Sequence, residues 1–130
     1  MLLREIVNAQ KAWTEIADQK MDVRASFVLM KYIKRLDEEL KLFNEQRTRI
    51  VNEFSEKSDG EQTIPKEKAQ TVIQMLNDLM NIESDIPLID MTLDELVQSL
   101  QMNPGNTIST TALVCIEPFF KTQDEKAPDA

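Results

Sequence analysis

Apolar residues recur at helical spacing along most of the chain, and the longest such pattern runs from Phe27 to Phe54. Its steps are three or four residues, or seven across Arg47, which predicts one apolar stripe along a single long helix. The stripe consists of Phe27, Met30, Ile33, Leu36, Leu40, Phe43, Ile50 and Phe54. With Asp22 as its N-cap, a helix over residues 22–57 would be about 50 Å long. Other elements must cover so long a helix.

A second helical pattern precedes it, over residues 2–20, with the stripe Leu2, Ile6, Ala9, Trp13 and Ile16. The break at 20–23 is short, so the first two helices should be antiparallel neighbours. Trp13 is then expected to anchor the packing between them. The turn residues at 56–61, including Gly60, should end the long helix.

A third helix is predicted over residues 65–83, with Pro65 in its first turn. Its apolar positions are Ala69, Val72, Ile73, Leu76, Leu79, Met80 and Ile82. It should pack back against the far half of the long helix. Residues 85–91 read as a short extended segment that could pair with 61–64.

Two short helices are predicted near the C-terminus. Thr92 and Glu95 form a capping box for a helix over 92–101. After a turn at 103–106, Ser109, Thr110 or Thr111 can cap a last helix. That helix would carry Leu113, Ile116, Phe119 and Phe120.

The expected fold is therefore mainly α: a long antiparallel helical hairpin, a third helix, a small C-terminal helical lobe and one short two-stranded β pairing. The length of 130 residues suits one domain, assigned to 1–120. Residues 121–130 are polar, contain Pro128 and are expected to form a disordered tail.

The net charge of −8 is unevenly distributed. Residues 1–50 carry ten Lys/Arg against eight Asp/Glu (+2), whereas residues 51–130 carry five against fifteen (−10). This balance argues against direct nucleic-acid binding, which needs basic density. Solubility explains the acidity most simply, and a basic partner or nucleic-acid mimicry is the functional alternative.

The apolar runs are too short to cross a membrane, and the N-terminus lacks a signal-peptide pattern. With one cysteine, Cys115, no internal disulfide can form, and we expect a protein of the reducing cytosol. Cys115 lies in an apolar run and is expected to be a buried, inert thiol.

The composition offers little for catalysis, because the chain has no histidine and one cysteine. Carboxylates three residues apart, as in helical Mg²⁺-dependent nucleotide pyrophosphohydrolases, occur at Glu15 and Asp18 and at Glu53 and Glu56. Such spacing arises readily in a chain with 23 acidic residues. We therefore expect a non-enzymatic protein without cofactor or metal, and keep the pyrophosphohydrolase as a remote alternative.

Two charged groups are candidate partner-binding sites. The acidic group comprises Glu83, Asp85, Asp90, Asp94 and Glu95, and the basic group comprises Lys31, Lys34 and Arg35. The basic group is more simply a solvated, ion-paired helix face, although it could dock an acidic protein surface. Among the methionines, Met91 and Met102 are the two that flank a helix rather than fill a stripe.

The order of these motifs resembles a family of small uncharacterised helical proteins from bacteriophages and prophages of Gram-positive bacteria. The resemblance spans about residues 5–120 and rests on the link 20–24, the long-helix segments 32–40 and 47–50, the segment 76–83 and the closing segment 113–119. It implies a phage or prophage origin and carries over no catalytic residue.

We therefore expect a protein that acts through protein–protein binding. The first hypothesis is a structural or assembly accessory of the tail region. The alternative is an inhibitor of a host defence or transcription protein, acting by acidic nucleic-acid mimicry. The partner would be a second copy, a phage protein or a host protein, in the cytoplasm of the host bacterial cell or associated with the virion. A homo-oligomer would bury apolar surface left open along the long helix.

Overall fold

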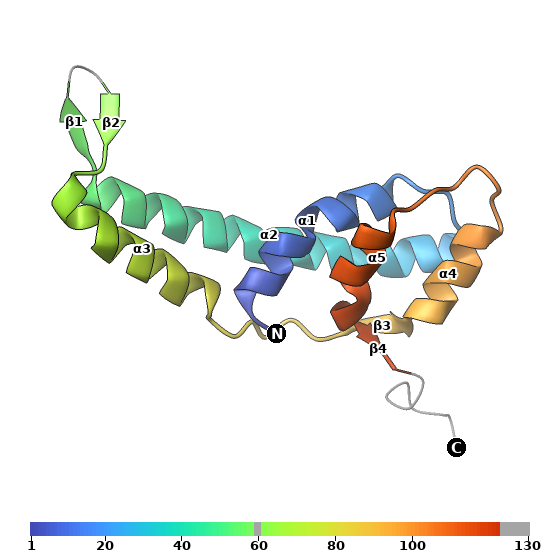
Figure 1. The fold of residues 1–130 in the computed structure, drawn as a ribbon. Helices are drawn as coiled ribbons and strands as arrows, with labels where there is room; N and C mark the ends of the chain where they lie inside the picture. Colours follow the sequence, from blue (N-terminus) through green and yellow to red (C-terminus); the bar gives the residue numbers. More distant parts are fainter. Residues whose placement is uncertain (59–60, 123–130) are drawn as a thin grey trace.

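The longest element of the computed structural model, which describes residues 1–58 and 61–122, is the helix α2 (Val23–Phe54). Its 32 residues make it about 48 Å long. Asp22 caps it as predicted, because the Asp22 carboxylate accepts a hydrogen bond of 2.8 Å from the Ala25 backbone N–H. Figure 1 shows that α1 (Leu3–Ala17) crosses the middle of α2, while α3 (Lys66–Met80) runs back along its far half.

The remaining elements form a hairpin at the far end and a lobe at the near end. The hairpin consists of β1 (Glu56–Ser58) and β2 (Glu61–Thr63). The lobe contains β3 (Ile89–Thr92), α4 (Leu93–Gln101), α5 (Thr110–Ile116), the 3-10 turn η1 (Glu117–Phe119) and β4 (Phe120–Lys121). The fold is mainly α, with a long hairpin, a third helix and a C-terminal lobe, as the sequence predicts.

The predicted caps of the short helices are confirmed. The Thr92 hydroxyl accepts from the Glu95 backbone N–H at 3.2 Å, and the Glu95 carboxylate accepts from the Thr92 N–H at 3.4 Å. Among the three candidates for the last helix, Ser109 is the cap and accepts from the Ala112 N–H at 3.1 Å. Pro65 occupies the N-cap position of α3.

The predicted stripe on α2 is wrong in its first third. The buried residues of α2 are Ala25, Leu29, Tyr32, Leu36, Leu40 and Phe43, whereas Phe27 and Met30 are 54% and 59% exposed. A step of three residues falls about 60° short of a full helical turn. Three such steps in succession place Phe27 on the opposite side of the helix from Leu36.

The predicted pairing of 61–64 with 85–91 is also wrong. β2 pairs antiparallel with β1, with Glu56 opposite Thr63, and β3 pairs parallel with β4, with Ile89 opposite Phe120. The local hairpin closes a much shorter loop than the predicted pairing and so loses less chain entropy. Gly60, one of the turn residues expected to end the long helix, lies outside the described residues.

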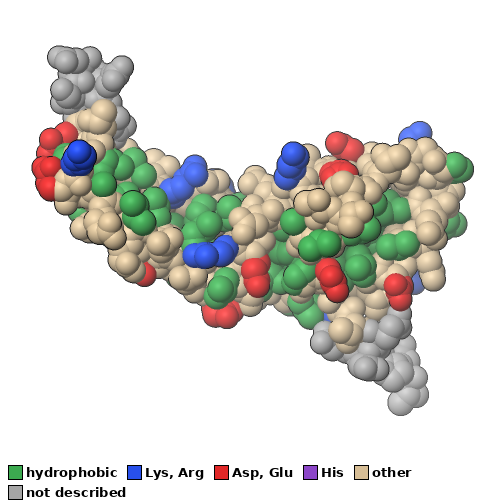
Figure 2. Space-filling model, in the orientation of Figure 1, with side chains coloured by type: hydrophobic (Ala, Val, Ile, Leu, Met, Phe, Trp, Pro, Cys, Tyr) green, Lys and Arg blue, Asp and Glu red, His purple; other side chains and the backbone are tan. Residues whose placement is uncertain are grey.

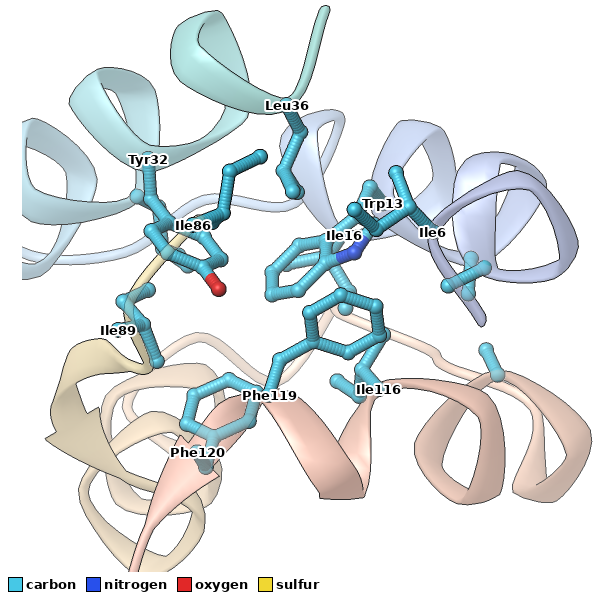
Figure 3. Close-up of a cluster of buried hydrophobic side chains, with 14 of the residues drawn as sticks. Ile6, Trp13, Ile16, Tyr32, Leu36, Ile86, Ile89, Ile116, Phe119 and Phe120 are labelled. Carbon is cyan, nitrogen blue, oxygen red and sulfur yellow. The ribbon is translucent and has the colours of Figure 1, made fainter. Parts of the chain in front are cut away.

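The core is centred on Trp13, the predicted anchor between the first two helices. Its ring makes an edge-to-face contact with Tyr32 of α2, with 5.6 Å between ring centroids. It also contacts Phe119 at 5.4 Å and stacks on Phe120 at 5.9 Å. Figure 3 shows these rings meeting with Ile16, Leu36, Ile89 and Ile116. The C-terminal segment therefore completes the same core as α1 and α2.

One boundary differs from expectation at the C-terminus. Lys121, which the sequence places in the disordered tail, belongs to β4. The rest of the predicted tail from residue 123 lies outside the described residues. Cys115, which the sequence predicts to be buried, is half-buried. Met91 is buried, and Met102 is 71% exposed.

Candidate partner-binding groove

The basic residues Lys31, Lys34 and Arg35 are all exposed on α2. They lie away from the buried side of the helix because they fall between the positions that contact the core. Phe27 stands one turn before Lys31 on the same side. This side of α2 faces residues 85–90, which comprise the end of the connection from α3 and the first two residues of β3.

A groove of about 320 Å³ lies between these two elements and is called the α2 groove here. It is lined by Phe27, Val28, Lys31, Tyr32 and Arg35 from α2 and by Pro87, Leu88, Ile89 and Asp90 from the facing segment. A hollow of about 610 Å³ adjoins it, since Lys31 and Arg35 line both, and adds Lys34, Glu38, Glu39, Leu42 and Asp85. The lining is largely apolar, with charges at the rim.

Tyr32 holds the two walls of the groove together. Its hydroxyl donates a hydrogen bond of 2.8 Å to the Pro87 carbonyl oxygen. Burial raises the pKa of Tyr32 to about 12, although the Arg35 guanidinium acts in the opposite direction. The phenol therefore stays protonated and remains a donor at neutral pH.

Phe27 lies at the mouth of the α2 groove with a cation over its ring. The Lys31 ammonium is 5.5 Å from the centroid of the Phe27 ring, which is within the range of a cation–π interaction. An exposed aromatic ring that is already oriented loses little side-chain entropy when a partner covers it.

The five acidic candidates do not form one surface. Asp85 and Asp90 lie along the groove and its adjoining hollow, and the Asp90 carboxylate accepts from the Lys121 ammonium at 3.3 Å. Glu95 serves the capping box of α4. Asp94 is exposed and lies near Pro118 in a separate hollow.

Glu83, the remaining candidate, is engaged by the start of the chain. Its carboxylate accepts from the Met1 ammonium at 2.7 Å, and this hydrogen bond is the main reason why the pKa of the ammonium is raised. Backbone hydrogen bonds join the same two segments: the Leu3 N–H donates to Ile82 O at 2.9 Å, and the Ser84 N–H donates to Met1 O at 2.7 Å. Glu83 is thus a structural contact.

The candidate site includes residues that the sequence did not reveal. The apolar pattern places Phe27 in the core stripe, and no motif marks Tyr32, Pro87 or Leu88 for binding. The signal available for Phe27 was the run of three-residue steps, which rotates it away from the core. No local sequence signal predicts the contact between Tyr32 and Pro87, which are 55 residues apart.

The carboxylate pairs considered for Mg²⁺ are not brought together. Glu15 accepts from the Ser109 backbone N–H at 2.9 Å, and Glu56 pairs with Lys68 at 3.4 Å. Figure 1 places the end of α1 and the end of α2 far apart along the molecule. Within residues 1–58 and 61–122, no group of three or more acidic or cysteine side chains could hold a metal ion.

No helix among the described residues combines the length and the apolar character that crossing a bilayer requires.

Comparison with curated proteins and with solved structures gives no match. A family model described as "Ran-binding: RanGTP-binding protein" matches residues 24–130. The matched stretch is well over half of the chain and contains both walls of the α2 groove. The chain therefore belongs to this RanGTP-binding protein family.

Proposed function

We propose that this protein has no catalytic activity and works by binding another protein in the α2 groove. The observation that carries the proposal is the hydrogen bond between Tyr32 and Pro87, which fixes two elements around an apolar floor. Phe27 supplies an exposed aromatic anchor, and aromatic residues are common among those that dominate binding energy. Lys31 and Arg35 supply charges at the rim.

The partner class that the family description supports is the GTP-bound form of a Ran-type small GTPase. The partner's contact surface should carry acidic side chains for Lys31, Lys34 and Arg35 and an apolar pocket for Phe27. Rim charges of this kind mainly set the association rate and the choice of partner. The charges would therefore select the partner, and Phe27 would contribute affinity.

The test is a titration of the purified protein with Ran loaded with either a non-hydrolysable GTP analogue or GDP. We expect saturable binding to the GTP-analogue form and weaker binding to the GDP form. The double variant Lys31→Glu/Arg35→Glu should lose affinity by about tenfold or more. Lys11→Glu/Lys41→Glu makes the same charge change at exposed positions outside the groove and should bind like the wild type. Absence of binding to both nucleotide forms would contradict the GTPase partner.

A second candidate function rests on the resemblance to phage and prophage proteins. Two of the segments that carry this resemblance are 32–40 and 76–83. The first lies on α2, and the second covers the end of α3 and the three residues after it. In this case the chain would be a structural or assembly accessory in an infected bacterial cell, with a phage protein in the α2 groove. The host-inhibitor version is less favoured, because Glu83, Asp90 and Glu95 already contact groups within the chain.

The two candidate functions can be distinguished by identifying which proteins bind to the tagged protein. The phage hypothesis predicts that phage tail proteins from an infected culture bind the wild type and are lost with the Lys31→Glu/Arg35→Glu variant. The GTPase hypothesis predicts a nucleotide-dependent complex with purified Ran instead. Retention of a nucleic-acid-binding host protein that depends on Asp85 and Asp94 would support the inhibitor.

A further inference from the structure

The far half of the molecule carries apolar side chains that the core does not use. The α2–α3 arm is defined here as residues 44–54 of α2 together with α3, residues 66–80. Leu79 is the one buried arm residue that belongs to the core cluster, and Ile50 and Met80 pack against that cluster. Val72 is buried as well but does not belong to the core cluster. Five further apolar residues of the arm are half-buried: Val51, Phe54, Ala69, Met75 and Leu76.

The apolar stripe of α3 is wider than α2 can cover. Val72 and Leu79 are its buried members. At 100° per residue, Leu76, Met80 and Ile73 are rotated from Val72 by about 40°, 80° and 100°, all to the same side. Ile73, the most rotated of the three, is 53% exposed. Figure 2 shows hydrophobic side chains gathered on this part of the molecule.

The arm is a single layer of two helices. Figure 1 shows that α1 and the C-terminal lobe lie over the other half of α2. Two helices with an apolar stripe ordinarily need a second layer to bury it. The arm therefore lacks a partner layer in the isolated chain.

The charge of the arm indicates what that layer is. The arm contains four basic and four acidic residues, so its net charge is zero, whereas the whole chain carries −8. The basic residues are Arg47, Arg49, Lys66 and Lys68, and the acidic residues are Glu45, Glu53, Glu67 and Asp78. An arm with balanced charges and an apolar stripe can meet its own copy without net repulsion. The whole net charge of −8 is carried by the rest of the chain.

We infer that the α2–α3 arm docks on the same arm of a second copy, related by a two-fold axis, and forms a four-helix bundle. This inference is independent of the function proposed for the α2 groove. α3 is about 22 Å long and two packed helices are about 20 Å across, so each copy offers a face of about 450 Å². Stable interfaces commonly bury about 800 Å² per partner. The dimer should therefore dissociate on dilution.

The experiment is sedimentation velocity or light-scattering mass over a dilution series from about 200 μM to about 1 μM. The wild type should change from twice the chain mass of 15.0 kDa to that mass as it is diluted. Ile73→Glu should stay monomeric throughout, because it places a charge on the exposed part of the α3 apolar stripe, midway along the helix. Val114→Glu changes an apolar residue of α5 that is 62% exposed and should dimerise like the wild type.

Folding is checked separately by circular dichroism and thermal unfolding. Because Ile73 is exposed in the single chain, Ile73→Glu should leave the helical signal and the melting temperature of the monomer unchanged. A wild type that is monomeric at every concentration would overturn the inference. So would an Ile73→Glu variant that dimerises normally, or a Val114→Glu variant that alone abolishes the dimer.

Discussion

The Tyr32 hydroxyl and the Pro87 carbonyl oxygen are 55 residues apart in sequence and form a hydrogen bond of 2.8 Å. This bond joins the middle of the first half of α2 to the segment between α3 and β3. It fixes the spacing of the two walls of the α2 groove, and the Tyr32 ring also contacts Trp13 in the core. The groove is thus tied to the aromatic core of the molecule.

The substitution Tyr32→Phe tests this bond. It keeps the ring but removes the donor, so the part-buried hydrogen bond to the Pro87 carbonyl oxygen is lost. We expect the free energy of unfolding to fall by about 1 kcal/mol, measured by urea denaturation. Thr14→Ala is the control, because its hydroxyl bonds Gln10 O at an exposed site, and it should have a smaller effect. Equal stability of Tyr32→Phe and the wild type would show that the bond does not hold the groove.

The titration of Tyr32 is a second test of its burial. The chain has one tyrosine, so the phenolate signal comes from Tyr32 alone. The pKa of Tyr32 is raised to about 12 in the folded protein, against about 10 for an unfolded chain. The unfolded state therefore loses its proton first. The stabilising contribution is complete below the unfolded value and is lost as the pH rises from there to about 12. Ultraviolet absorbance of the phenolate should show this late transition, and a midpoint near 10 in folded protein would contradict burial of the ring.

The N-cap of α2 should respond to acid. The pKa of Asp22 is lowered, first by the hydrogen bond from the Ala25 N–H and also by the bond from the Ser99 hydroxyl. The stabilising contribution is therefore present above the usual carboxyl pKa and is lost as the pH falls through the lowered value. Asp22→Asn keeps an acceptor but does not titrate. Its melting temperature should vary less with pH on the acidic side than that of the wild type, and parallel curves would remove Asp22 from the acid response.

The capping box of α4 can be tested with two matched variants. Thr92→Ala removes the hydroxyl that accepts from the Glu95 N–H and should lower the free energy of unfolding by about 1 kcal/mol. Thr92→Ser keeps the hydroxyl and should lose less. If the two variants are equally destabilised, the loss comes from packing of the Thr92 methyl group, since Thr92 is buried, and not from the cap.

The boundaries of the helices could be predicted because their signals are local. Asp22, the pair Thr92 and Glu95, and Ser109 each bond a backbone N–H three residues away. The α2 groove could not be predicted in the same way. Its walls meet because α3 turns the chain back along α2, and the rotation of each side chain about the helix axis depends on this packing. The parallel pairing of β3 with β4 likewise joins segments about thirty residues apart.

Phe27 and Phe43 lie on different sides of α2, so the same substitution should change stability by different amounts. Phe43 is 7% exposed, whereas Phe27 is 54% exposed. Phe43→Ala should lower the free energy of unfolding by about 3 kcal/mol or more. A charged residue at position 43 would therefore disrupt folding. For this reason it is unsuitable as a test of the proposed dimer. Phe27→Ala should change stability by about 0.5 kcal/mol or less.

The partner measurement then separates folding from function for these two positions. Phe27→Ala should weaken binding in the α2 groove, because it removes the aromatic anchor and the ring beneath Lys31. Leu42→Ala provides the matched control, since Leu42 is 58% exposed and lies in the adjoining hollow beyond the basic residues. It should weaken binding less than Phe27→Ala, because Leu42 lines only the adjoining hollow and Phe27 lines the α2 groove itself. If both variants bind like the wild type while the Lys31→Glu/Arg35→Glu variant does not, recognition is electrostatic and Phe27 is not an anchor.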